Sequence, residues 1–484
     1  MSTFHGLEMA RQALSTQQSA LYTTGHNIAN ANTEGYTRQR VNFETLSPYP
    51  SASRNRPQIP GQMGTGVESG SVQRIRNQFL DNQFRSENST SGYWETRSEA
   101  LGRMENVLNE PSDTGLSTTI DQFWQSLQDL AVNPENSGAR SVVLQRGQAL
   151  AETFNYLSDS LTNIRTDLQT QIETTVKDAN TLIDGISELN KQVKNLETHG
   201  YAANDLYDRR DMLIDELSNI VSIDVRYDQG HIPSGKVGDG VATINIVNDS
   251  GTEIAEIVNG VEGEIQKINA PVYNNAETLS VVSSINVNDT NVMSSSGSLK
   301  GLLASYGYTD GENVAGDYPD MLTKLDSMAY TVATAFNEQH GSDFFEIENS
   351  IGAATSISVA IIDGSDINAG SNDDSGNGDN ALALAEVFYT ASESLDGASI
   401  KDFYESVIGD LGVTAEHVNR MTENTGTLLA QVENQRLSVS QVSLDEEMSN
   451  MIKFQHAYSA AARSMTTMDE MLDKIINSMG LVGR

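Results

Sequence analysis

The C-terminal stretch from Ser443 to Val482 constrains the fold most strongly, because it contains no Pro and no Gly before Gly480. Large, mostly apolar residues recur in it at every seventh position, and a second row follows three positions later. Two such rows lie side by side on one face of a helix and are typical of a coiled-coil seam. The first row is Leu444, Met451, Tyr458, Met465, Leu472 and Met479, and the second is Glu447, Phe454, Ala461, Met468, Ile475 and Val482. A helix with one apolar stripe requires a partner to pack against.

Residues 4–31 repeat this pattern more weakly. Leu7, Leu14, Leu21 and Ile28 stand seven residues apart, and small Ala residues lie between them. Since both ends of the chain carry a single narrow apolar stripe, we expect the two terminal helices to pair with each other. The alternative is that they are two unrelated amphipathic helices, each packing on a separate domain.

The composition excludes several classes of function. The 484-residue chain has 66 Asp and Glu against 30 Lys and Arg, a net charge of −36, which disfavours nucleic acid and anionic lipid as partners. The absence of Cys excludes disulfides, thiolate metal sites and thiol catalysis. No cleaved signal peptide and no membrane-spanning stretch are visible, so we expect a protein that stays in the cytoplasm or leaves it without a classical signal.

The spacing of apolar residues changes twice in the middle of the chain. From Tyr93 the apolar spacing is helical, and steps of three and four residues continue from Leu150 to Val193, which indicates a long-helix bundle. The charged run Asp208–Asp211 is interpreted as a solvated helix face with local ion pairs. At Val221 the pattern becomes alternating and predicts strands, and helical spacing returns after Gly301.

We therefore expect a mainly α-helical, elongated multidomain chain with an inserted β-rich domain. The predicted parts are a terminal coiled-coil inner domain at 1–45 and 440–484, an extended connector with short strands and the start of the helical domain at 46–92, a central helical bundle at 93–221 and 297–439, and an outer β-rich domain at 222–296.

Sequence motifs for catalysis or metal binding are missing. The seven His are scattered without metal-ligand spacing, and no HExxH, P-loop or nucleophile-elbow motif occurs. Residues 373–379 weakly resemble a calcium loop, but its last ligand position would be Leu384 instead of Glu. We expect no enzymatic activity, no cofactor and no metal.

Two terminal segments carry a family resemblance. Asn27–Arg38, with the sequence NIANANTEGYTR, resembles the Asn-rich segment near the N-terminus of bacterial flagellar axial proteins, the rod, hook and hook-associated proteins. Ser443–Tyr458, with the sequence SLDEEMSNMIKFQHAY, resembles their C-terminal segment, and its SLDEE variant is closest to the hook-associated proteins. Parts of Tyr93–Phe154 and Gly301–His340 agree with the same group.

The resemblance implies a structural subunit that joins hook to filament and is needed for filament assembly. It implies export through the flagellar type III apparatus without a cleaved signal peptide, and a position outside the cell at the hook–filament junction. The implied partners are further copies of the chain in a helical ring, the hook protein, the second junction protein or filament, and a cytoplasmic export chaperone on the C-terminal helix. The alternatives are another axial protein, from the distal rod or hook, and a secreted coiled-coil adhesin.

The coiled-coil, assembly and chaperone contacts are assigned to apolar residues of the two terminal helices. These residues are Leu7, Leu14, Leu21, Ile28, Leu444, Met448, Met451, Phe454, Tyr458, Met465, Met468, Leu472, Ile475 and Ile476. Met448, Met471 and Ile476 lie outside the two rows, so we expect them to contact neighbouring subunits. We also expect residues 1–45 and 440–484 to be poorly ordered in the free monomer and to fold on assembly.

Overall fold

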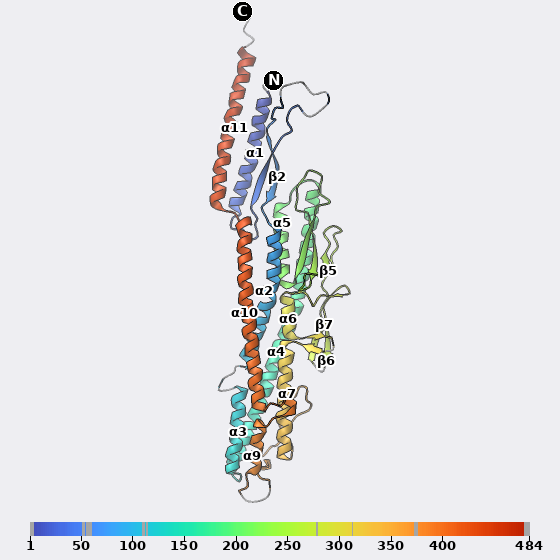
Figure 1. The fold of residues 1–484 in the computed structure, drawn as a ribbon, viewed down its shortest axis with the longest axis vertical. Helices are drawn as coiled ribbons and strands as arrows, with labels where there is room; N and C mark the ends of the chain where they lie inside the picture. Colours follow the sequence, from blue (N-terminus) through green and yellow to red (C-terminus); the bar gives the residue numbers. More distant parts are fainter. Residues whose placement is uncertain are drawn as a thin grey trace, which may run out of the picture.

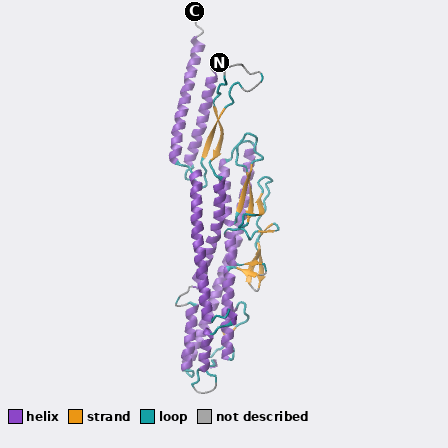
Figure 2. Cartoon of the chain, in the orientation of Figure 1, coloured by secondary structure: helices purple, strands orange, loops and turns teal. Residues whose placement is uncertain are grey.

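The computed structural model describes residues 4–50, 54, 61–108, 112, 115–276, 279–311, 313–371 and 376–478. The molecule is elongated, with long helices running along its axis and small sheets attached to one side (Figures 1 and 2). Both ends of the chain lie at the same end of the molecule (Figure 1). The expected fold class, mainly helical and elongated with inserted β-structure, is confirmed.

A bundle of helices, called the rod below, forms the body of the molecule. Its helices are α2 (Gln78–Leu108), α3 (Leu116–Val132), α4 (Ser137–Thr198), α5 (Asn204–Ile220), α6 (Ser298–Tyr306), α7 (Asp317–His340) and α10 (Ile400–Ser440). Most of the apolar positions predicted between Leu150 and Val193 are buried, because α3, α5, α6 and α7 pack along α4. Aromatic rings fill the part of the core far from the termini, where the Phe123 ring lies 5.4 Å from Phe336 and 5.6 Å from Phe388.

Short elements between α7 and α10 complete the rod. They are β12 (Phe345–Glu346), α8 (Ala353–Ser356), β13 (Ser358–Val359), η1 (Gly364–Asp366), α9 (Asp379–Glu386), η2 (Val387–Tyr389) and η3 (Glu393–Leu395).

Helix α2 begins at Gln78, within the segment 46–92 that is predicted to hold the start of the helical domain. One prediction for the rod is wrong. The charged run Asp208–Asp211 does not form a solvated face, since Asp208, Arg210 and Asp211 are only 5%, 0% and 2% exposed.

Small sheets lie on one side of the rod (Figure 1). One sheet has the order β3-β4-β5, from Ile223–Asp228, Val241–Val247 and Glu253–Val258. A second has the order β11-β10-β7-β6, from Asn313–Ala315, Tyr308–Asp310, Leu279–Ser284 and Val272–Ala276. A third pairs β8 (Asn286–Val287) with β9 (Thr290–Asn291). Strands β10 and β11 of the second sheet follow α6 in the chain, and β10 pairs with β7 in parallel.

The inner pair consists of α1 (Phe4–Ala29) and α11 (Leu444–Ser478), which pack side by side at one end of the rod (Figure 1). This confirms the predicted pairing of the two terminal helices. An antiparallel hairpin of β1 (Gln39–Thr45) and β2 (Val67–Arg74) lies next to α1. Helix α10 ends at Ser440, and residues 441–443 separate it from α11. Ser443 stands at the N-cap of α11, where its Oγ accepts from the Glu446 amide at 3.5 Å.

Candidate assembly interface

Contacts at both ends of the inner pair fix an antiparallel register. Near one end, a Cβ atom on Gly6 would lie 2.9 Å from Met468 Cε, so the missing side chain makes room for the methionine. Near the other end, Asn27 Nδ2 donates to Glu447 Oε2 at 3.1 Å. Six residues of the two predicted rows of α11 are half-buried. They are Met451, Phe454, Ala461, Met465, Met468 and Leu472.

Helix α1 buries a face that the sequence analysis missed. Its buried residues are small or polar, Ala10, Thr16, Ala20, Thr23, Thr24 and Asn27, whereas Leu7, Leu14, Leu21 and Ile28 are half-buried. The reason is a second partner, the β1–β2 hairpin: Thr16 Oγ1 donates to the carbonyl of Val67 at 3.2 Å. The hairpin also reaches α11, where the rings of Phe43 and Phe454 meet edge to face at 6.0 Å. The inner domain therefore contains three packed elements.

Helix α11 carries many exposed apolar residues, three of which, Leu444, Tyr458 and Ile475, belong to the two predicted rows. Seven large apolar side chains on this helix are between 38% and 69% exposed, namely Leu444, Met448, Ile452, Tyr458, Met471, Ile475 and Ile476. Met479 and Val482, the last members of the predicted rows, lie outside the described residues. An apolar surface of this extent on one helix is typical of a protein–protein contact site.

The two segments that carry the family resemblance contact each other. Asn27 Nδ2 donates to the Gln39 carbonyl at 2.8 Å as well as to Glu447, and Asn27 Oδ1 accepts from Tyr36 Oη at 2.7 Å and from the Gln39 amide at 3.0 Å. Arg38 Nε donates to Glu447 Oε1 at 2.8 Å. Burial, together with nearby carboxylates, raises the pKa of Tyr36 well above its usual range, so its hydroxyl remains a donor. The Asn-rich segment thus closes a buried polar contact between the chain ends.

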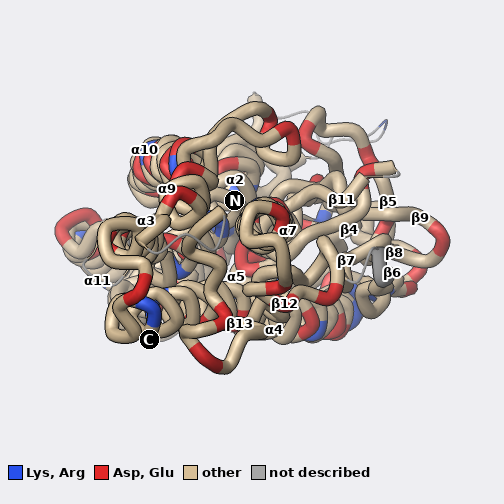
Figure 3. Tube along the Cα trace, turned by 90° about the horizontal axis from the view of Figure 1, so that it is seen from below, with Lys and Arg blue, Asp and Glu red and all other residues tan. Residues whose placement is uncertain are grey.

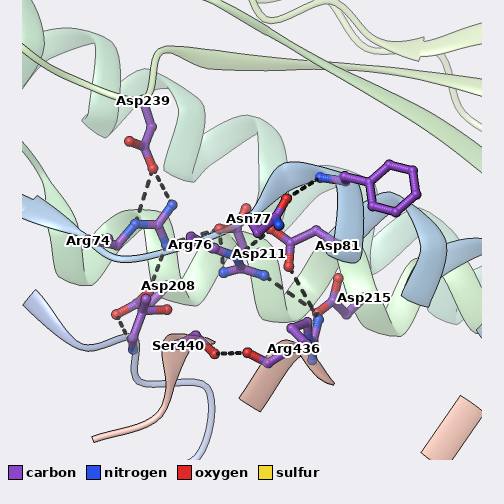
Figure 4. Close-up of polar contacts among 12 residues, drawn as sticks. Arg74, Arg76, Asn77, Asp81, Asp208, Asp211, Asp215, Asp239, Arg436 and Ser440 are labelled. Atoms are coloured by element: carbon purple, nitrogen blue, oxygen red, sulfur yellow. Dashed lines mark hydrogen bonds and ion pairs between the residues drawn. The ribbon is translucent and has the colours of Figure 1, made fainter. Parts of the chain in front are cut away.

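A cluster of buried ion pairs, called the joint, connects the inner domain to the rod (Figure 4). It contains Arg74, Arg76, Arg85 and Arg436 with Asp81, Asp208, Asp211, Asp215 and Asp239. Arg74 stands at the end of β2 and donates to Asp208 on α5 at 2.7 Å, and it also contacts Asp239 in the loop between β3 and β4. The joint therefore links the hairpin, the rod and one outer sheet.

The charges of the joint are mutually dependent. Burial alone would raise the pKa of Asp211, but Arg76, Arg74, Arg210 and Arg85 together hold it well below its ordinary value. Burial raises the pKa of Asp208 in spite of Arg74. Elsewhere, Asp and Glu are spread over helices and loops around the molecule (Figure 3). A buried charge is costly without its partner, so each ion pair favours one arrangement of the segments it connects.

The Asn-rich segment Asn27–Arg38 contacts the joint beside an open hollow. The Thr37 amide donates to Asp208 Oδ2 at 3.1 Å, and the Arg38 amide donates to the Ser440 carbonyl at 2.9 Å. A hollow of about 710 Å³ lies between residues 31–37, α2, α5 and the last turns of α10. The chain ends are thus held to the rod by a few polar contacts around an incompletely filled space.

The described residues contain neither a metal-binding cluster nor a membrane-spanning helix. No group of three His, Asp or Glu among them could hold a metal ion. The weak calcium-loop pattern includes Asp373 and Ser375, which lie outside the described residues. No helix in the described part of the chain is long and apolar enough to span a membrane.

Family comparisons agree with this architecture of terminal helices joined to a helical rod. Residues 101–354 match the family "Flagellar hook-associated protein FlgK helical domain". Residues 7–37 match "Flagella basal body rod protein", and residues 433–479 match "Flagellar basal body rod FlgEFG protein C-terminal". These matches define the class: the chain is a structural, non-enzymatic axial protein of the bacterial flagellum.

The relatives narrow the class to one family. "Flagellar hook-associated protein 1" of Bacillus subtilis is 46% identical, covering 100% of both chains, and the protein of the same name from Escherichia coli is 25% identical over 97% of this chain and 98% of that protein. The solved structure of the flagellar hook junction protein FlgK from Burkholderia pseudomallei shares the fold, with a TM-score of 0.61 and 14% identity, covering 74% of this chain and 100% of that one. The chain belongs to the flagellar hook-associated protein 1 family, the FlgK hook–filament junction proteins.

Proposed function

We propose that copies of this chain form a ring between hook and filament and that the filament cannot assemble without this ring. Membership of the FlgK family supports assembly with hook and filament components. The observation that carries the proposal is the set of exposed apolar residues on α11, a helix that pairs with the helix at the other end of the chain. In a ring, neighbouring subunits would cover Met448, Ile452 and Met471. The hook protein lies on one side of the ring, and the second junction protein or the filament on the other.

α11 serves three partners in succession. In the cytoplasm, an export chaperone binds it and keeps its apolar residues covered. After export of the unfolded chain without a cleaved signal, α11 pairs with α1, and in the ring it contacts its neighbours. Methionine suits such successive contacts because its side chain adapts to differently shaped surfaces, and six of the fifteen methionines lie in Met448–Met479.

α1 and α11 are poorly ordered in the free monomer and become ordered in the ring. The half-buried seam and the few polar contacts to the rod support this order of events. Hydrogen exchange on the purified monomer tests it, with the rod as internal reference. Strong protection of α11 amides in the absence of any partner would contradict it.

Deleting residues 440–484 tests the function. Cells with the truncated chain should build hooks that lack filaments, and the purified truncated chain should no longer bind the chaperone. The full-length chain should be found at the distal end of isolated hook–basal bodies. If the deletion strain lacked hooks as well, a role in the distal rod or hook would replace the proposed one.

A further inference from the structure

A buried acid on α11 depends on the opposite end of the chain for its partners. Glu447 is 2% exposed. Its carboxylate accepts from Arg38 Nε at 2.8 Å and from Asn27 Nδ2 at 3.1 Å, and these residues precede it by 409 and 420 positions. Without residues 27–38 in place, α11 would have to bury an unpaired charge or leave this end of the seam open.

The dependence is reciprocal. Asn27 is buried, and one of its four hydrogen bonds ends on Glu447. The guanidinium of Arg38 is largely buried between Glu446 and Glu447, and both of its ion pairs go to α11. An N-terminal segment docked without α11 would therefore leave the Arg38 charge and an Asn27 amide hydrogen without these partners.

We propose that Asn27, Arg38 and Glu447 form a latch that makes the two chain ends fold only together. Closing the latch also places the Arg38 amide on the Ser440 carbonyl and the Thr37 amide on Asp208, which fixes the inner domain on the rod. With the latch open, α11 remains free for a partner in the cytoplasm. With the latch closed, the exposed apolar residues of α11 are held in position for neighbouring subunits. This regulatory role rests on the proposed function, whereas the folding role does not.

Two adjacent acids provide a matched comparison. Glu446 and Glu447 both accept hydrogen bonds from Arg38, but their side chains are 62% and 3% exposed. Glu447→Gln would place an amide donor against Asn27 Nδ2 and remove a buried charge. Glu446→Gln changes a solvent-screened pair of small effect.

The cysteine-free sequence allows a direct test on the purified full-length chain. Gly6→Cys and Met468→Cys place two thiols in contact at the end of the inner pair remote from the latch. Their rate of disulfide formation reports how often α1 and α11 are paired, even if pairing is rare in the monomer. In this background, Glu447→Gln should slow disulfide formation at least tenfold, and Glu446→Gln should slow it less than twofold.

Replacing both members of the buried pair completes the test. Arg38→Met with Glu447→Met leaves no unpaired buried charge, so disulfide formation should be faster than with Arg38→Met or Glu447→Met alone. Equal rates for Glu446→Gln and Glu447→Gln, or a double variant slower than both single variants, would overturn the latch. Thermal melting of the rod in every variant shows whether the remainder of the chain has folded.

A measurement in cells separates the latch from the proposed function. Glu447→Gln should be exported at the normal level but retained on hooks at least tenfold less, with the missing protein in the medium. Glu8→Gln, which breaks the exposed pair with Arg11 on α1, should be retained normally. If the wild-type chain itself were absent from hooks, the proposed function would fail, and the disulfide rates would still decide the folding role of the latch.

Discussion

In the rod, α4 buries Leu161, Ile172 and Ile183 completely, whereas in the inner pair α11 leaves Met448, Ile452 and Ile476 exposed. Both regions are built from long helices with regular apolar spacing. They differ in the number of neighbours: α4 is covered by several helices, whereas α11 packs mainly on α1 and touches the hairpin among the described residues. Apolar spacing therefore predicts which residues are available for burial, and the number of neighbours decides how many of them are buried.

This difference also separates two kinds of stability. The rod has a continuous apolar core of its own, so its stability belongs to the single chain. The inner domain relies on a half-buried seam, small residues and polar contacts such as Asn27 with Glu447. Exposed apolar surface is typical of a protein–protein contact site, so we expect further copies to cover this region in the proposed ring.

The largest contrast is expected from removing one phenylalanine ring in each region. Phe123→Ala empties a fully buried site in the rod and should lower the free energy of unfolding by about 3–5 kcal/mol. Phe454→Ala removes a half-buried ring and should lower it by less than about 1 kcal/mol. Chemical denaturation followed by circular dichroism measures both values, and equal losses would contradict the contrast between rod and inner pair.

Breaking the joint should have the next largest effect. Asp211 accepts from Arg76 at 2.7 Å and forms an ion pair with Arg74 at 3.0 Å. Asp211→Asn removes the negative charge that these buried guanidinium groups share and places an amide donor near them. We expect a loss of roughly 3 kcal/mol in the free energy of unfolding. Asp224→Asn is the control, because its pair with Arg226 is exposed and should contribute less than about 0.5 kcal/mol. Comparable losses in the two variants would show that the buried ion pairs of the joint contribute no more to stability than an exposed pair.

A smaller effect should come from pH and should act on the rod. Buried His340 accepts from the Asn368 amide through Nε2 at 3.0 Å and donates through Nδ1 to the Ser342 carbonyl, and the bond accepted at Nε2 requires the neutral ring. Burial lowers the pKa of His340 below its ordinary value of 6.5. The resulting stability is complete above pH 6.5 and is lost as the pH falls through the folded-state pKa, by at most about 1.4 kcal/mol per pH unit.

His340→Gln removes this titration. The difference in melting temperature between the wild-type chain and the variant should therefore shrink as the pH falls from 7.5 to 5, in thermal melts of the full-length chain. A constant difference over this range would mean that His340 contributes no pH dependence.

The smallest effect on monomer stability should accompany a complete loss of function. Met448→Ser with Ile452→Ser changes two exposed residues of α11 and should alter the free energy of unfolding by no more than about 0.5 kcal/mol. The same cells should have hooks without filaments. Val413→Ser, at an exposed position on α10, should leave both stability and filaments unchanged. Normal filaments with the double variant would show that this side of α11 is not the subunit contact.

Much of this organisation could be predicted from the sequence because it depends on local periodicity. The two rows of α11, the weaker row of α1 and the steps of three and four along α4 each predicted a helix with an apolar side, and all three helices are present. The pairing of the terminal helices followed because each had one stripe and no other evident partner. The residues outside the rows, Met448, Met471 and Ile476, are exposed in the monomer, and their contact with neighbouring subunits stays a prediction.

Only the tertiary structure decided which polar residues are buried. Asp208 and Asp211 lie in a charged run that resembles a solvated face, yet they are buried because Arg74 and Arg76 arrive from the end of the hairpin. Asn27 and Glu447 form a hydrogen bond although 420 positions separate them in the chain. A charged or amide side chain has no periodicity that reveals its partner, since its burial depends on a matching group from a distant segment. The sequence therefore determined the helices and their apolar sides, and the assembled fold determined how the two chain ends are joined to each other and to the rod.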